Sequence, residues 1–75
     1  MYKTSDTPLA TFLIHQGFTL DIITYKNGQA FFVFPNNSDV LQQSVSQYKN
    51  GTAIVNLRSY IDINRDLIKR IKEGI

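Results

Sequence analysis

The strongest constraint on this chain is the Asn27-Gly28 pair, which separates two runs rich in β-branched and aromatic residues, Phe18 to Lys26 and Gln29 to Pro35. Asn-Gly between two such runs is typical of a two-residue turn whose central residues adopt positive φ. We therefore predict a β-hairpin at the centre of the domain.

The same turn determines which hairpin residues share a face of the sheet. One face is predicted to carry three pairs: Tyr25 with Ala30, Ile23 with Phe32, and Asp21 with Phe34. The other face is predicted to carry Thr24 with Phe31 and Ile22 with Val33. Because both faces are apolar, we expect a sheet covered on both sides.

Two short helices are predicted on either side of the hairpin from their caps, breakers and apolar spacing. The first spans about residues 6–16, with Thr11 and His15 facing water. The second runs from Val40 to about Lys49 and presents an uncharged outer surface.

A third helix is predicted from Leu57 to about Glu73, with Asn56 as its cap. Its apolar residues fall on one broad arc, opposite the charged residues: Leu57, Tyr60, Ile61, Ile63, Leu67, Ile68, Ile71 and Ile75. Asn64 lies within this arc, where a polar residue can set the register of a helix–helix contact, including one in a dimer, or make an ordinary amide contact. We expect the helix to cover Phe31 and Val33.

With short strands at Tyr2–Thr4 and Thr52–Val55, the order becomes β-α-β-β-α-β followed by a helix, as in ferredoxin-like domains. The predicted fold class is therefore α+β: a hairpin-centred antiparallel sheet with a C-terminal amphipathic helix, in a single domain over residues 1–75.

Composition limits the classes of function. The chain has 75 residues, no cysteine and one histidine, so it excludes a disulfide framework and a thiolate metal site and fits a cytoplasmic setting. We expect neither a secretory signal nor a membrane span. Eight basic against six acidic residues give a net charge of +2, which by itself does not indicate nucleic acid.

The strand after the turn partly resembles the ribonucleoprotein signature of RNA-recognition domains, in which aromatic side chains stack on bases. Aligned on Gly28, the chain keeps the signature residues Gly28, Ala30, Phe31 and Phe34. It departs from the signature at Asn27, Gln29 and Phe32. The resemblance makes Phe31 a candidate for base stacking, against the alternative that it belongs to the core.

A second resemblance spans nearly the whole chain. It rests on four segments: Ser5-Asp6-x-x-Leu9-Ala10-x-Phe12-Leu13 with Gly17, Phe32-Val33-Phe34, Tyr48-x-Asn50-Gly51, and Val55-Asn56-x-Arg58-x-Tyr60. This pattern is similar to a family of small uncharacterised proteins encoded by phages, prophages and bacteria. The resemblance implies a mobile-element setting and assigns no role to any residue.

No pattern in the chain indicates catalysis. His15 has no acidic or nucleophilic neighbour at helical spacing, and we interpret it as a surface residue. We interpret Asp21 as an edge residue beside solvent. Phosphate loops, nucleophile elbows and carboxylate clusters are missing from the sequence. We expect a non-enzymatic protein with no cofactor, no metal and no small-molecule substrate.

The candidate binding residues are the cations on the polar side of the last helix. Arg58, Arg65, Lys69 and Lys72 lie within about 60° of one another at 100° per residue. They either form a solvated face, laced by Arg58–Asp62 and Lys69–Glu73 pairs, or contact phosphates.

Two hypotheses follow. We favour a protein-interaction or regulatory module that binds a protein partner or a second copy through apolar surface of the hairpin or last helix. The alternative is a nucleic-acid-binding accessory domain, with Arg58, Arg65, Lys69 and Lys72 on phosphates and Phe31 stacking on a base.

Overall fold

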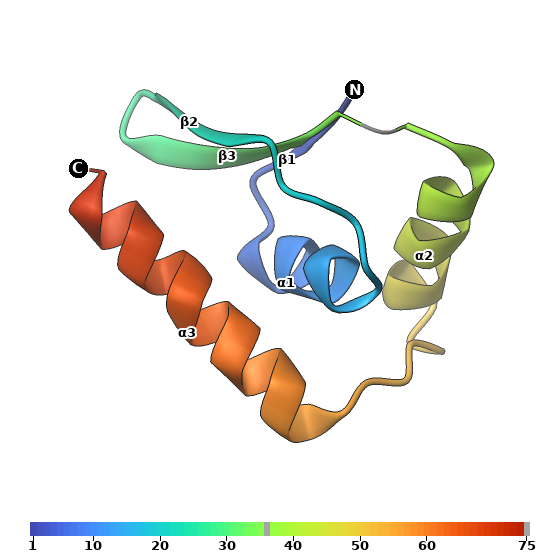
Figure 1. Cartoon of the computed structure of the whole chain (residues 1–75). Coiled ribbons are helices and arrows are strands. Elements are labelled where there is room, and N and C mark those ends of the chain that lie inside the picture. Colours follow the sequence, from blue (N-terminus) through green and yellow to red (C-terminus); the bar gives the residue numbers. More distant parts are fainter. Residues whose placement is uncertain (36, 75) are drawn as a thin grey trace.

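The computed structural model describes residues 1–35 and 37–74. Over these ranges the elements are β1 (Tyr2–Thr4), α1 (Thr7–His15), β2 (Ile22–Lys26), β3 (Gln29–Phe34), α2 (Asp39–Lys49) and α3 (Leu57–Glu73), as shown in Figure 1. The predicted α+β class, with a hairpin-centred antiparallel sheet and a C-terminal amphipathic helix, is confirmed. Ile75, which we predicted on the apolar arc of the last helix, lies outside the described residues.

The hairpin forms at the predicted turn. Asn27 has φ 53° and Gly28 has φ 78°, so both central residues occupy the left-handed region that a type I′ turn requires. The register from Ile22–Val33 to Lys26–Gln29 is as predicted.

The predicted pair between Asp21 and Phe34 is wrong. The ladder ends at Ile22, and the Asp21 N–H donates to the Val33 carbonyl at 2.9 Å. Phe34 pairs instead with Tyr2, on the other side of β3. Asp21 is exposed, which agrees with its interpretation as an edge residue beside solvent.

The sheet has three antiparallel strands in the order β1-β3-β2, so β3 is central. The strand that we predicted for residues 52–55 is not formed, and the ferredoxin-like order remains incomplete in the described chain. The cause is local: both the N–H and the hydroxyl of Thr52 bond to the Gln47 carbonyl, at 3.0 and 3.3 Å. This segment therefore turns back on the end of α2 instead of reaching the edge of the sheet.

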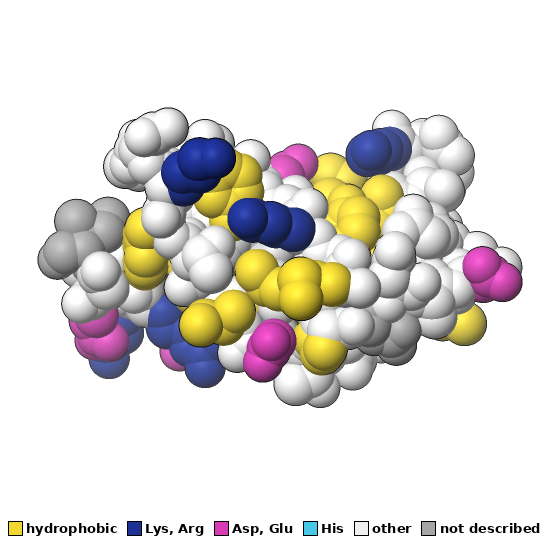
Figure 2. Space-filling view, turned by 90° about the horizontal axis from the view of Figure 1, so that it is seen from above, with side chains coloured by type: hydrophobic (Ala, Val, Ile, Leu, Met, Phe, Trp, Pro, Cys, Tyr) yellow, Lys and Arg dark blue, Asp and Glu magenta, His cyan; other side chains and the backbone are white. Residues whose placement is uncertain are grey.

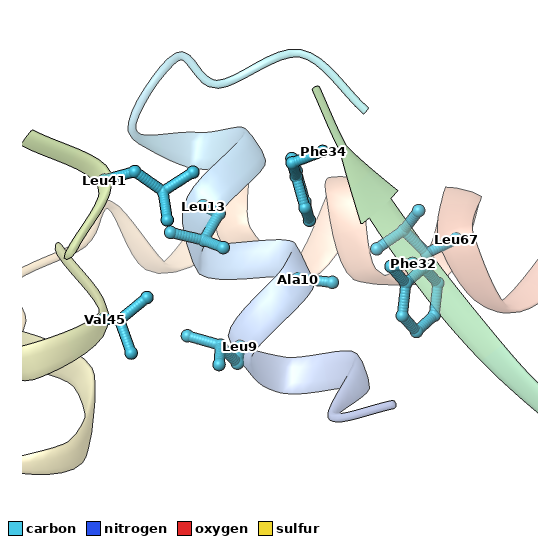
Figure 3. Close-up of a cluster of buried hydrophobic side chains, with 8 residues drawn as sticks. All are labelled: Leu9, Ala10, Leu13, Phe32, Phe34, Leu41, Val45 and Leu67. Atoms are coloured by element: carbon cyan, nitrogen blue, oxygen red, sulfur yellow. The ribbon is translucent and has the colours of Figure 1, made fainter. Parts of the chain in front are cut away.

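All three helices lie on one face of the sheet, with α1 between α2 and α3 (Figure 1). The core lies between α1, α2, α3 and the inner side of β3, and Figure 3 shows its buried residues: Leu9, Ala10, Leu13, Phe32, Phe34, Leu41, Val45 and Leu67. The prediction that the last helix covers Phe31 and Val33 is therefore wrong. Leu67 of α3 packs in the cluster that contains Phe32, on the side of β3 opposite to Phe31.

Each helix begins at a capping side chain. Asp6 Oδ1 accepts the Leu9 N–H at 3.1 Å, Ser38 Oγ accepts the Leu41 N–H at 3.3 Å, and Asn56 Oδ1 accepts the Ser59 N–H at 3.0 Å. Such a bond satisfies an amide that has no partner within the helix and contributes about 1 kcal/mol. The predicted helix starts, to within a residue or two, are thus explained by local chemistry.

The seam between α1 and α3 contains a polar pair. Thr11, which we expected to face water, is fully buried because α3 lies over it. Its hydroxyl donates to the Thr7 carbonyl at 2.8 Å and accepts from Asn64 Nδ2 at 3.0 Å. Asn64 therefore serves a helix–helix contact within the chain, since its amide meets the hydroxyl that α3 buries.

Candidate protein-interaction surface

The apolar arc of α3 is only partly buried. Leu67 is 1% exposed and faces the core, whereas Leu57 is 68% exposed and Ile68 is 40% exposed. Ile61 is half-buried and lies within about 40° of both at 100° per residue. We name Leu57, Ile61 and Ile68 the apolar stripe of α3. Ile54, in the segment that leads into the helix, is also exposed.

The four predicted cations lie beside this stripe on the solvent side of α3. Arg58, Arg65, Lys69 and Lys72 are all exposed, and we name them the basic ridge. Arg65 and Lys72 are the nearest to the stripe, within about 60–80° of Leu57 around the helix axis. The helical spacing in the sequence was sufficient to predict the ridge.

Ion pairing leaves most of the ridge available. Arg58 Nε lies 3.7 Å from Asp62 Oδ2, as predicted, and both side chains are well exposed. Instead of the predicted Lys69–Glu73 pair, the structure has Arg70 Nε 3.5 Å from Asp66 Oδ2. Among the described residues, Arg65, Lys69 and Lys72 have no carboxylate within 4.0 Å. Exposed pairs contribute roughly 0.2–1 kcal/mol, so the Arg58–Asp62 pair is too weak to prevent Arg58 from binding a partner.

Phe31 lies away from the ridge, on the face of the sheet that the helices leave open. Its ring is half-buried, and Lys3 Nζ lies 5.0 Å from the ring centroid. Figure 2, which views this side of the molecule, shows hydrophobic side chains with basic ones beside them. The single surface of Phe31 with the four ridge cations, which the nucleic-acid hypothesis expected, is therefore not assembled. Sequence reasoning missed Lys3, whose alternation with Tyr2 and Thr4 in a strand was the available signal.

On its other flank α3 borders an open groove of ≈ 560 Å³. The groove is lined by apolar residues of α1, α3 and the loop before β2, with charged residues at the rim: Ile14, Phe18, Thr19, Leu20, Asp62, Ile63, Asp66 and Arg70. The Arg70–Asp66 pair lies at this rim.

His15 is half-buried at the end of α1, and its Nδ1 lies 3.5 Å from Gln16 Nε2.

Two tyrosines tie the helix ends together around Asp6. The Tyr48 hydroxyl donates to Asp6 Oδ1 at 3.4 Å, and the Tyr60 hydroxyl donates to the Pro8 carbonyl at 3.2 Å. Burial raises the pKa of both phenols above 10.0, and the negative charge of Asp6 raises it further. The native state thus favours the neutral form of each phenol.

This cluster predicts a loss of stability at high pH. Because the folded pKa values of Tyr48 and Tyr60 lie above the unfolded value of about 10, the native state retains protons that the unfolded state has released. The free energy of unfolding, measured in urea, should stay constant from about pH 8 to 9 and fall as the pH rises through about 10. The Tyr48→Phe/Tyr60→Phe variant should show a smaller fall, and an unchanged fall would contradict this role.

None of the helices in the described part of the chain combines the length and apolar character that crossing a membrane requires. Comparison with curated proteins and with solved structures finds no match. A family model described as a domain of unknown function, DUF5659, matches residues 1–74. The expectation of an uncharacterised family is thus confirmed: the chain belongs to the DUF5659 family, a domain of unknown function.

Proposed function

We propose that this domain is a non-enzymatic protein-interaction module that binds an acidic amphipathic helix of a partner protein along α3. The observation that carries the proposal is the exposure of the apolar stripe, 68% at Leu57 and 40% at Ile68, directly beside the basic ridge. Apolar residues at helical spacing are the anchors that a second helix uses when it lies in a groove or against a helix face.

The stripe is supported from behind. On its buried side α3 is held to α1 by the Asn64–Thr11 hydrogen bond and by the Tyr60–Pro8 hydrogen bond, and Leu67 fills the core. A helix fixed in this way loses little conformational freedom when it binds, so more of the contact energy is available as affinity.

The ridge determines the charge of the partner. Arg65 and Lys72 border one side of the stripe, so acidic residues along that rim of a docked helix would meet them at the polar edge of the contact. Charge pairs of this kind mainly increase the association rate and the selectivity, and their effect weakens with salt.

The alternative is that the ridge contacts the phosphates of a nucleic acid. Aliphatic side chains border the ridge, whereas the candidate stacking residue Phe31 lies on another face, which favours the protein partner. We further propose a cytoplasmic, mobile-element setting such as a phage, supported by the lack of cysteine and by the resemblance of the residue pattern to small phage-encoded proteins.

The test uses a defined probe: a 20-residue amphipathic peptide with leucines on one face and glutamates along its rim. By fluorescence anisotropy at low salt, the wild-type domain should bind this peptide more tightly than the same peptide with lysines in place of the glutamates. Leu57→Asp/Ile68→Asp should weaken binding at least about tenfold, equivalent to about 1.4 kcal/mol.

The control for each single change, Leu57→Asp or Ile68→Asp, is Val40→Asp, which places one aspartate on an exposed aliphatic residue of α2 and should leave the affinity unchanged. Equal affinity for both peptides, or an unaffected Leu57→Asp/Ile68→Asp variant, would overturn the proposal. Tight binding of single-stranded RNA that is lost on replacing Arg65 and Lys69 by Ala would favour the nucleic-acid alternative.

A further inference from the structure

The edge of β2 is open. The strand order β1-β3-β2 gives β2 a neighbour on one side only, over five residues. In a ladder closed by a two-residue turn, alternate residues bond inward, so the N–H and C=O groups of Ile23 and Tyr25 point away from β3. Edge strands are usually blunted by proline, bulges or central charges. The central residues Ile23, Thr24 and Tyr25 offer none of these protections.

We propose that a second copy of this chain pairs with this edge, β2 against β2, antiparallel about a two-fold axis through Thr24. Only residues whose groups point outward can bond across the new contact, so Ile23 and Tyr25 must each face an outward-pointing residue of the second copy. Centring the axis on Thr24 meets this condition and pairs the whole strand. The result is one continuous six-stranded sheet, made of two three-stranded sheets.

The charges of β2 suit pairing with itself. Lys26 ends the strand and Asp21 precedes it. Antiparallel pairing places each Lys26 opposite the uncharged Ile22 of the second copy and keeps the two lysines at opposite ends of the contact. Parallel pairing would place the two lysines side by side, where they repel. The edge is therefore self-complementary in the antiparallel sense, as an isologous two-fold contact requires.

Along this edge, apolar side chains are exposed and one hydroxyl lacks a hydrogen-bond partner, and a second copy could cover the former and bond to the latter. Two large side chains of β2 are exposed to solvent: Ile22 is 53% exposed and Tyr25 is 40% exposed. The Thr24 hydroxyl oxygen is the one buried side-chain polar atom that lacks a hydrogen-bond partner among the described residues. On the two-fold axis, Thr24 would face Thr24 of the second copy, and rotation about χ1 would let the hydroxyls form a cross-strand bond.

This contact is independent of the apolar stripe, because it uses the edge of the sheet and no residue of the stripe. A dimer built this way would carry two copies of α3. A partner that presents two acidic helices could then bind with higher avidity than either site provides alone.

The test is a charge exchange at the axis, read by sedimentation velocity and light scattering. The wild-type chain should be a concentration-dependent dimer. Thr24→Lys alone and Thr24→Glu alone should each weaken dimerisation at least about tenfold, because like charges then face each other across the axis. An equimolar mixture of the two variants should recover the dimer. Thr19→Lys, on an exposed loop residue, is the matched control and should dimerise like the wild type.

Far-ultraviolet circular dichroism and a thermal melt establish that each variant is folded. Should Thr24→Lys fail to fold, Thr24→Arg replaces it as the positively charged partner of Thr24→Glu, and recovery on mixing these two variants still decides the question. A wild type that is monomeric at every concentration, or a Thr24→Lys chain that dimerises like the wild type, would overturn the proposal. Loss of the dimer in Leu57→Asp/Ile68→Asp would also overturn it, because the contact would then lie on α3.

Discussion

Replacing Phe32 by Ala is expected to lower the free energy of unfolding by about 3–5 kcal/mol, the usual cost of truncating a buried phenylalanine. Phe32 is fully buried on the central strand β3, in the core cluster that includes Ala10 of α1 and Leu67 of α3. Domains of this size have a total stability of about 5–15 kcal/mol, so the variant should lose a large part of it. Urea denaturation followed by circular dichroism measures the change.

The matched control is Phe31→Ala, the same truncation one residue earlier on the opposite face of the sheet. Because Phe31 is only half-buried and lies on the face opposite the helices of the described chain, its loss should cost about 1 kcal/mol. If the two variants lost the same free energy, the sheet would have to be covered on both faces, as the hairpin pattern alone suggested.

The local parts of this fold could be predicted from the sequence. Asn27-Gly28 can adopt the two positive φ values of a type I′ turn, and this turn sets the register of β2 and β3. Asp6, Ser38 and Asn56 each satisfy an amide in the first turn of a helix, so the helix starts could also be predicted. In each case the decisive interaction joins residues that are at most a few positions apart.

The placement of α3 could not be predicted, because the two faces of the hairpin are nearly alike in hydrophobicity. One face of β3 carries Phe32 and Phe34 and the other carries Phe31 and Val33, so the sequence pattern does not show which face α3 covers. The choice depends on α1, which packs against both β1 and α3 and thereby places α3 on its own side of the sheet. Thr11 became buried for the same long-range reason.

The candidate site also has features that the sequence could predict and features that depend on tertiary packing. The basic ridge follows from the helical period alone, so its four cations could be predicted as one surface. The relation of the ridge to Phe31 depends on which face of the sheet α3 covers, and the pairing of Lys3 with Phe31 depends on β1 joining β3. The width of the buried part of α3 also depends on its neighbours, which is why the apolar stripe emerged only from the structure.

Replacing Leu67 by Ala should cost about 2–5 kcal/mol, because the side chain is 1% exposed and lies in the core cluster with Phe32. The better helix propensity of alanine offsets only a few tenths of this loss. An isolated amphipathic helix of this length is marginal in water, so α3 should loosen before the rest of the domain. Hydrogen exchange of the α3 amides, together with urea denaturation, measures both effects.

Ile68→Ala is the control, since Ile68 is the next residue of the same helix and is 40% exposed. It should cost less than about 1 kcal/mol and leave the exchange of the α3 amides nearly unchanged. The pair also bears on the proposed docking surface. Equal losses at Leu67 and Ile68 would mean that the apolar arc is buried across its full width, and α3 would then have no apolar stripe to offer a partner.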